Sequence, residues 1–392
     1  MIKSSKEKRV NIALVRGAYL NNFEGQNYHA CELLDKNISI TGIASNKSIH
    51  QQFPFQIVRL PSAADYNILG RWGRAIANRT YGDIQNLFGI EKYASRFDIF
   101  HTADPHYYYS YQLAKLRHDN KIRKLIVTSW ETIPYNNESI SVKKKNKYFV
   151  MNNADHFICH TLKAKQCLIK EGVQESKTSL IRLGIDLDVF QNKETNTHKN
   201  NQIVNILFVG RLVEEKGIMD AYKAYKKIKS QISKGKNKSK KLKIKFTIIG
   251  NGPLRKNLLK EVQHDKFNRS VTIVEKTYEE MPQVYKNADI FILPSKQMST
   301  WEEQYGMVFL EAMAFGLPIV AYDTGVIQEI VSNAGVLCKG NDIQSLARSL
   351  NHLVFNTYAR VKVGTIGKER VKMMFNCKNT AAELNKLYFS TI

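Results

Sequence analysis

The chain has 392 residues, of which 43% are hydrophobic and 10% aromatic, so it is long enough for two domains and too apolar for a disordered protein. No uninterrupted apolar run reaches the roughly 18 residues of a membrane-spanning helix, which predicts that the chain has none. The formal net charge of +24 favours partners that carry phosphate.

Short apolar runs alternate with helical stretches in the first half of the chain, and this alternation predicts a largely parallel sheet wrapped by helices. The predicted strands are residues 10–15, 38–43, 57–60, 97–100, 125–128, 157–160 and 180–183.

The loop after the first strand passes through Gly17 and leads to Gly25, close to the start of a predicted helix. Ligands of open α/β sheets bind beyond the carboxyl ends of the strands, and glycine lets a backbone approach a ligand closely. We therefore predict that Gly17 and Gly25 face a ligand, with a plain turn as the alternative. The loop lacks Gly-x-Gly-x-x-Gly spacing, so no ordinary dinucleotide site is predicted.

A histidine, His101, follows the strand predicted over residues 97–100. Its imidazole is predicted to donate a hydrogen bond to a ligand hydroxyl. The alternative is a strand-end histidine whose ring is bonded to the backbone.

Residues 191–202 contain no aliphatic or aromatic side chain, so we place a domain boundary there. A second sheet is predicted beyond it, and a helix over residues 368–388 ends the chain. The strands of the second sheet are residues 203–209, 246–249, 271–274, 289–293 and 318–321.

Two cations stand in the loop between the first strand and first helix of this second sheet. Gly210 and Arg211 begin the loop, and Lys216 and Gly217 lead into the helix. Cations at a strand-to-helix junction are typical of phosphate sites, and two solvated surface charges are the alternative. Gly250 and Gly252, after the next strand, are predicted to let backbone pass near a nucleotide.

Two glutamates, Glu303 and Glu311, are eight residues apart with Gly306 between them. A helix that begins near Gly306 or Met307 and ends at Gly316 would direct its free amides at a phosphate. Eight residues of helix span about 12 Å, so the two carboxylates suit separate hydroxyl-bearing parts of one ligand. A nucleotide-sugar has this layout.

The Glu303–Glu311 motif with Gly306, together with GRLVEEKG over residues 210–217, resembles the retaining GT-B glycosyltransferases of the fourth family, the glycosyl transferases group 1. The likeness is tightest over residues 205–329. It implies two Rossmann-like α/β domains whose parallel sheets face a central cleft, and transfer of a sugar from a nucleotide-sugar donor with retained anomeric configuration.

The resemblance also implies roles for the charged residues. The cations Arg211 and Lys216 would stabilise the departing diphosphate, so the reaction would need no metal and no other cofactor. The amides around the helix start would bind the same phosphates, at Gly306, Met307 and Val308.

Two further roles follow from the family. Glu303 would hold hydroxyls of the transferred sugar, and Glu311 those of the ribose. Relatives often have a histidine two residues after the position of His101, but Ala103 stands there in this chain, and the sequence does not say whether His101 or His106 acts instead.

The domain roles come from the resemblance as well. Residues 1–192 would form the acceptor-side domain, residues 203–375 the nucleotide-sugar-binding domain, and a helix over about 376–392 would pack back on the first. An acceptor surface of aromatic faces and charge is expected, with tyrosines packed at a helix start as the alternative. Its residues would be Arg71, Trp72, Arg74, Tyr107, Tyr108, Tyr109 and Tyr111.

Several alternatives remain at this point. A nucleotide-sugar epimerase or a phosphorylase has the same fold, whereas a glycoside hydrolase would place two carboxylates about 5–10 Å apart around one bond. The sequence does not identify the donor sugar, the base, or the acceptor, which is a glycan, a lipid-linked sugar or a small molecule.

Charge and cysteine content bear on the compartment. Residues 223–245 hold eleven lysines and no acidic residue, which predicts attraction to an anionic membrane surface. A solvated lysine-rich loop is the alternative. A basic nucleic-acid-binding protein is disfavoured because no nucleic-acid motif accompanies the charge.

Five scattered cysteines predict reduced, buried thiols, and the charged N-terminus predicts no signal peptide. We expect a cytoplasmic protein at the inner face of the membrane.

Overall fold

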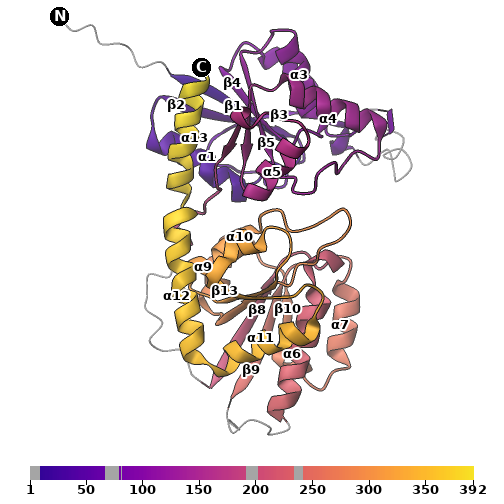
Figure 1. Ribbon diagram of the computed structural model, residues 1–392, viewed down its shortest axis with the longest axis vertical. Helices are drawn as coiled ribbons and strands as arrows, with labels where there is room; N and C mark the ends of the chain where they lie inside the picture. The colour runs from indigo at the N-terminus through magenta and orange to yellow at the C-terminus, as the bar shows by residue number, and fades with distance from the viewer. Residues whose placement is uncertain (1–8, 67–78, 81, 191–201, 234–241) are drawn as a thin grey trace, which may run out of the picture. The chain divides into compact units, whose positions relative to one another are not determined.

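The chain forms two compact units in the computed structural model, which describes residues 9–66, 79–80, 82–190, 202–233 and 242–392 (Figure 1). Unit 1 consists of Met1–Asp186 and Asn376–Ile392, and unit 2 of Leu187–Phe375. The predicted boundary at 191–202 lies outside the described residues except for Gln202, and so do Arg71, Trp72 and Arg74.

Unit 1 contains a seven-stranded parallel sheet in the order β3-β2-β1-β4-β5-β6-β7. Its strands are β1 (Val10–Gly17), β2 (Ile38–Ser45), β3 (Gln56–Leu60), β4 (Ile99–Ala103), β5 (Lys124–Ser129), β6 (His156–Cys159) and β7 (Thr178–Leu180). The seven predicted strands are confirmed, with two shifts. The strand β4 begins two residues later than predicted and contains His101, and β7 ends where the predicted strand begins.

Helices cover both faces of this sheet. Side chains of α1 (Asn22–Leu34) and α13 (Cys377–Thr391) share one apolar core with it. The second core contains side chains of α3 (Tyr108–His118), α4 (Ser141–Asn153) and α5 (Leu162–Lys170). The alternation of strand and helix predicted this architecture.

Unit 2 contains a six-stranded parallel sheet in the order β10-β9-β8-β11-β12-β13. Its strands are β8 (Ile203–Val209), β9 (Lys243–Ile249), β10 (Val271–Val274), β11 (Ile290–Ile292), β12 (Ile319–Tyr322) and β13 (Gly335–Cys338). The short edge strand β13 was not predicted, and only its last residue is buried.

Helices accompany this sheet as well, and α6 packs against α11 while α9 packs against α12. They are α6 (Ile218–Ser233), α7 (Arg255–Gln263), α8 (Met281–Lys286), α9 (Met307–Ala314), α10 (Ile327–Val331), α11 (Ile343–Phe355) and α12 (Thr357–Met374).

The helix predicted over residues 368–388 is wrong as a single element. It is two helices, because α12 ends at Met374 and α13 begins at Cys377. The side chain of Asn376 accepts a hydrogen bond from the Lys378 amide, which caps the second helix and satisfies a free donor of its first turn.

Each sheet reverses its winding direction at one point. In unit 1, β1 lies between β2 and β4; in unit 2, β8 lies between β9 and β11. The loops that follow β8 and β11 therefore diverge at the carboxyl edge of the sheet, and ligands of open α/β sheets bind at such a switch point.

Candidate active site

The loop after β8 is fixed to the end of β11 by a glycine. Residues Glu214–Lys216 form a short 3-10 helix, and Gly217 ends it with a φ of 67° in the left-handed region. A Cβ atom at Gly217 would overlap the Pro294 carbonyl, so only glycine fits both the backbone angle and the space. This contact holds Lys216 beside the segment that follows β11.

Lys216 and Glu303 form the centre of the site. The Lys216 Nζ donates to Glu303 Oε2 at 2.6 Å, and Ser295 Oγ donates to the same oxygen at 2.7 Å. The ammonium also lies 5.0 Å from the centroid of the Trp301 ring. Glu303 is only 5% exposed. An ammonium carries three protons, so the bond to Glu303 leaves Lys216 with donors for a further ligand.

Arg211 stands apart from this cluster. Its Nη2 lies 3.5 Å from Glu215 Oε1, and 64% of its side chain is exposed. Among the described residues, no hydrogen bond or ion pair joins Arg211 to Lys216 or Glu303. The convergence of the two cations on one phosphate therefore stays a prediction.

The helix start near Gly306 is confirmed. Gly306 has a φ of 78° and directly precedes α9, whose first residues are Met307 and Val308. The first amides of an α-helix have no acceptor inside the helix, and the dipole makes that end positive. At the other end Gly316, with a φ of 71°, donates its amide to the Met313 carbonyl and ends the helix as predicted.

Glu311 lies in the second turn of α9 and is only 2% exposed. The Tyr285 hydroxyl donates to its Oε2 at 2.6 Å. Burial raises the pKa of Glu311 to about 7, although the hydrogen bond from Tyr285 acts in the opposite direction. The two carboxylates thus differ: Glu303 contacts a cation as well as a hydroxyl, whereas the side-chain partner of Glu311 is a hydroxyl.

Gly250 and Gly252 follow β9 and pack against the loop after β8. A Cβ atom at Gly250 would overlap the Gly210 carbonyl, and one at Gly252 would crowd Leu212. The Leu212 amide also donates to the Asn251 carbonyl at 2.8 Å. These glycines therefore fix the loop that carries Arg211, while their approach to a nucleotide stays a prediction.

In unit 1 a buried ion pair holds the loop after β1. Arg16 Nη2 lies 2.7 Å from Glu24 Oε1, and both side chains are almost fully buried. Gly17 ends β1 with a φ of 53°, and Gly25 lies within α1. The ion pair explains how this loop keeps its conformation, and a ligand role for the two glycines stays a prediction.

The structure does not support His101 as a ligand donor. The ring is fully buried, with Nδ1 2.8 Å from the Tyr388 hydroxyl and Nε2 2.7 Å from Thr128 Oγ1. Burial lowers the pKa of His101 well below its usual value. Both ring nitrogens are thus engaged within unit 1, but by side-chain hydroxyls and not by the backbone groups that the alternative interpretation expected. Burial also lowers the pKa of His106, to about 3.

The tyrosines at the start of α3 are largely packed into the protein. Tyr109 is 1% exposed, and the Tyr107 ring stacks on it with centroids 5.3 Å apart. The Tyr107 ring also contacts the Tyr19 ring, with centroids 5.0 Å apart. This packing agrees with the alternative that we gave for these tyrosines.

Some residues of the site escaped the sequence analysis. Ser295 follows the end of β11, so the rule used for His101 would have found it. Thr324 Oγ1 donates to the Ser295 carbonyl at 2.6 Å and supports that position. Tyr285 gave no local signal, because it comes from α8, 26 residues before Glu311.

Comparisons with known proteins bear on both units. A family model described as Glycosyl transferases group 1 matches residues 189–370, and one described as Glycosyltransferase Family 4 matches residues 32–189. Together the two models match the chain from residue 32 to residue 370.

Two relatives come from bacterial polysaccharide biosynthesis. The chain is 30% identical over 213 residues to the amylovoran biosynthesis glycosyltransferase AmsK of Erwinia amylovora, covering 53% of this chain and 50% of AmsK. It is 28% identical over 214 residues to the capsular polysaccharide biosynthesis glycosyltransferase CapM of Staphylococcus aureus, covering 52% of each. The matched region thus spans about half the length of each relative.

A solved structure shares the fold. HepE of Anabaena, in complex with UDP, matches with a TM-score of 0.73 over 97% of this chain and 100% of HepE. The sequences are 14% identical, so the likeness concerns the fold alone. Two Rossmann-like domains with parallel sheets, as predicted, are confirmed.

Proposed function

The chain belongs to the glycosyl transferases group 1, whose fold is GT-B, and on that basis we propose that it transfers a sugar from a nucleotide-sugar to an acceptor. One observation carries the proposal: Lys216 is bonded to Glu303, which stands just before the free amides of α9. A cation, a carboxylate that could hold a sugar hydroxyl and a helix start that could bind phosphate thus lie in one unit, and this supports the proposal.

The donor is proposed to lie along this arrangement. The remaining Lys216 protons and the amides of Met307 and Val308 would bind the diphosphate, and Arg211 is exposed enough to turn toward it. Glu303 would accept a hydrogen bond from the transferred sugar. Glu311 would accept bonds from the ribose.

The reaction itself builds negative charge on the leaving diphosphate and positive charge on the anomeric carbon. Fixed donors aimed at the diphosphate lower the barrier, because they need no reorganisation as the charge develops. We propose that these donors replace a metal ion and that the anomeric configuration is retained. The names of AmsK and CapM support an acceptor from polysaccharide biosynthesis.

We expect Arg211→Ala and Lys216→Ala each to weaken nucleoside-diphosphate binding about tenfold to a hundredfold, the loss of one charge-assisted hydrogen bond. Calorimetry with UDP, GDP and ADP measures the loss and also identifies the base. Lys223→Ala, at an exposed lysine of α6, is the matched control. Unchanged affinity in a folded Arg211→Ala/Lys216→Ala double variant would mean that the site is placed wrongly.

A second prediction concerns the membrane. The net charge of +24 exceeds what one phosphate-binding site needs, so we propose that the protein associates with anionic membranes. Each basic residue near such a surface contributes about 1 kcal/mol, and salt screens the attraction. Cosedimentation should show binding to phosphatidylserine vesicles at low salt and little to phosphatidylcholine vesicles.

A matched variant locates this attraction. Replacing the lysines among residues 234–241 by glutamine should reduce the binding, whereas the same number of replacements elsewhere should reduce it less. Equal binding to neutral and anionic vesicles at low salt would rule out an electrostatic association. No helix among the described residues is long and apolar enough to cross a bilayer.

A further inference from the structure

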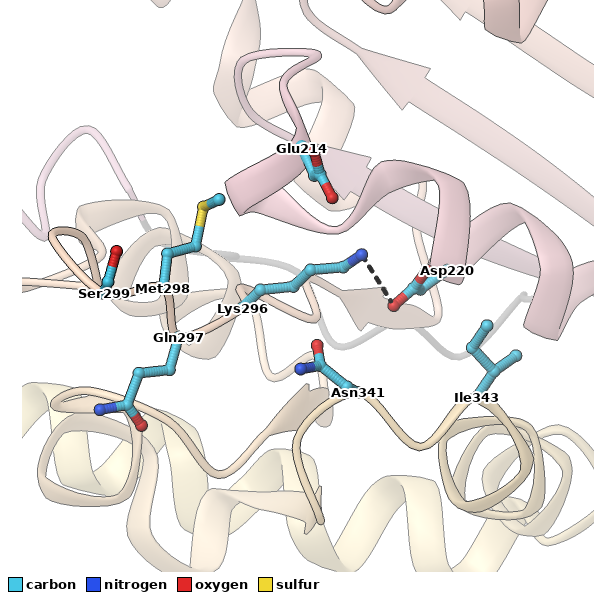
Figure 2. Close-up of a pocket in the computed structure, with 8 residues that line it drawn as sticks. All are labelled: Glu214, Asp220, Lys296, Gln297, Met298, Ser299, Asn341 and Ile343. Atoms are coloured by element: carbon cyan, nitrogen blue, oxygen red, sulfur yellow. Dashed lines mark ion pairs between the residues drawn. The ribbon is translucent and has the colours of Figure 1, made fainter.

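Unit 2 has a pocket of about 440 Å³ at the carboxyl edge of its sheet (Figure 2). The volume lies within the range of small-molecule sites, roughly 300–1,000 Å³. Its walls come from the loops after β8, β11 and β13 and from the first turns of α6 and α11. The lining residues are Glu214, Asp220, Lys296, Gln297, Met298, Ser299, Asn341 and Ile343.

A buried carboxylate lies at one end of the pocket. Asp220 is 5% exposed. Its Oδ2 accepts a hydrogen bond from the Tyr322 hydroxyl at 3.0 Å and forms an ion pair with the Lys296 Nζ at 3.4 Å. Figure 2 shows the Lys296 side chain reaching across the pocket to Asp220. The other carboxylate oxygen of Asp220, Oδ1, has no hydrogen-bond partner among the described residues, so it is able to accept a hydrogen bond from a ligand.

The other walls mix polar and apolar groups. The carboxylate of Glu214 and the amides of Gln297 and Asn341 form no side-chain hydrogen bond with any described residue, and they add both donors and acceptors. Met298 and Ile343 add apolar surface. The two carboxylates outnumber the one lysine, which disfavours a phosphate ligand. A neutral sugar matches such a lining, because its hydroxyls both donate and accept and its ring has an apolar face.

The pocket shares two segments with the donor site. Glu214 and Lys216 lie on the same 3-10 helix, and Lys296 directly follows Ser295, which bonds Glu303. The Lys296 amide also donates to the Glu215 carbonyl at 2.8 Å, which joins the two segments. A ligand in the pocket would therefore lie against the same loops that position the donor.

We propose that this pocket binds a sugar residue of the acceptor, one that does not itself react, and so selects an oligosaccharide acceptor. This inference rests on the proposed function, because it takes the Lys216–Glu303 region as the place where the donor sugar is held.

The test uses the full chain, labelled and applied to an array of microbial and synthetic oligosaccharides, followed by titration of the oligosaccharide that binds best. We expect the wild type to bind at least one oligosaccharide. Gln297→Ala/Asn341→Ala should bind it about tenfold to a hundredfold more weakly, the loss of two hydrogen bonds, with unchanged affinity for the nucleoside diphosphate. Gln344→Ala, an exposed amide of α11 outside the pocket, is the matched control and should behave as the wild type.

The outcomes separate this inference from the proposed function. If the wild type binds no oligosaccharide, or if the double variant binds as well as the wild type, the pocket is not a sugar site, even where nucleoside-diphosphate binding is intact. If the wild type fails to bind any nucleoside diphosphate, the proposed function fails instead. Asp220→Asn adds a second variant, accepted only if its thermal unfolding matches the wild type, because Asp220 also bonds Tyr322.

Discussion

Glu303→Ala is expected to lower kcat about 100-fold, the size of effect seen when one preorganised group of an active site is removed. The carboxylate has two functions in the proposed mechanism: it holds a hydroxyl of the transferred sugar, and its 2.6 Å bond places the Lys216 ammonium. Without it, the sugar loses an acceptor and the lysine loses its fixed position.

Binding of the bare nucleoside diphosphate should respond differently. That ligand has no transferred sugar, and removal of Glu303 leaves Lys216 free to bind phosphate, so we expect its affinity to stay within about threefold of the wild type. Glu303→Gln provides a matched control, since it keeps the shape of the side chain but loses the charge that attracts Lys216. Turnover should fall in both variants.

Glu311→Ala should have the converse effect. The ribose is present in both the nucleotide-sugar and the bare nucleotide, so both should bind about tenfold to a hundredfold more weakly. Calorimetry with both ligands on both variants makes the comparison. If Glu303→Ala abolishes binding of the bare nucleotide and Glu311→Ala does not, the roles are reversed. Full transfer activity in both variants would make residues 303–311 structural.

The sequence predicted the elements of the site but not their bonds. The spacing of Gly306 and Gly316 identified α9, because helix starts and ends depend on local residues. The bond between Lys216 and Glu303 joins residues 87 positions apart, and local spacing carries no information about it. Only the resemblance to a known family had indicated that these two residues belong to one site.

His101 shows the same limit. The sequence placed it just after a strand, whereas it lies in the middle of β4, and its partner Tyr388 lies 287 residues later, on α13. A strand-end histidine that faces a ligand and one that closes a buried network have the same local sequence. The fold, by contrast, followed from local apolar runs. The prediction of one helix over residues 368–388 failed because a single residue, the Asn376 cap, starts a second helix there.

Glu311→Gln is expected to stabilise the protein at neutral and alkaline pH but not at acidic pH. The folded pKa of Glu311 is about 7, because burial disfavours its charged form, against an ordinary value of 4.5. The folded state therefore binds the proton more tightly than the unfolded chain. As pH rises from about 4.5 to about 7, the folded state loses stability relative to the unfolded state, and above that range the loss remains constant.

The full loss is on the order of 3 kcal/mol, since each pKa unit corresponds to about 1.4 kcal/mol. Glutamine keeps an oxygen for the Tyr285 hydroxyl but has no charge to desolvate. In calorimetric unfolding, wild type and Glu311→Gln should have similar Tm values near pH 5 and diverge by several degrees near pH 8. Glu369→Gln, at an exposed glutamate of α12, controls for the change in net charge.

The two outcomes have different meanings. If the difference in Tm between wild type and Glu311→Gln is the same at both pH values, ionisation of Glu311 does not destabilise the folded state. If it diverges, the protein keeps a destabilising carboxylate at a buried position, as expected where a side chain is retained for binding the ribose rather than for stability.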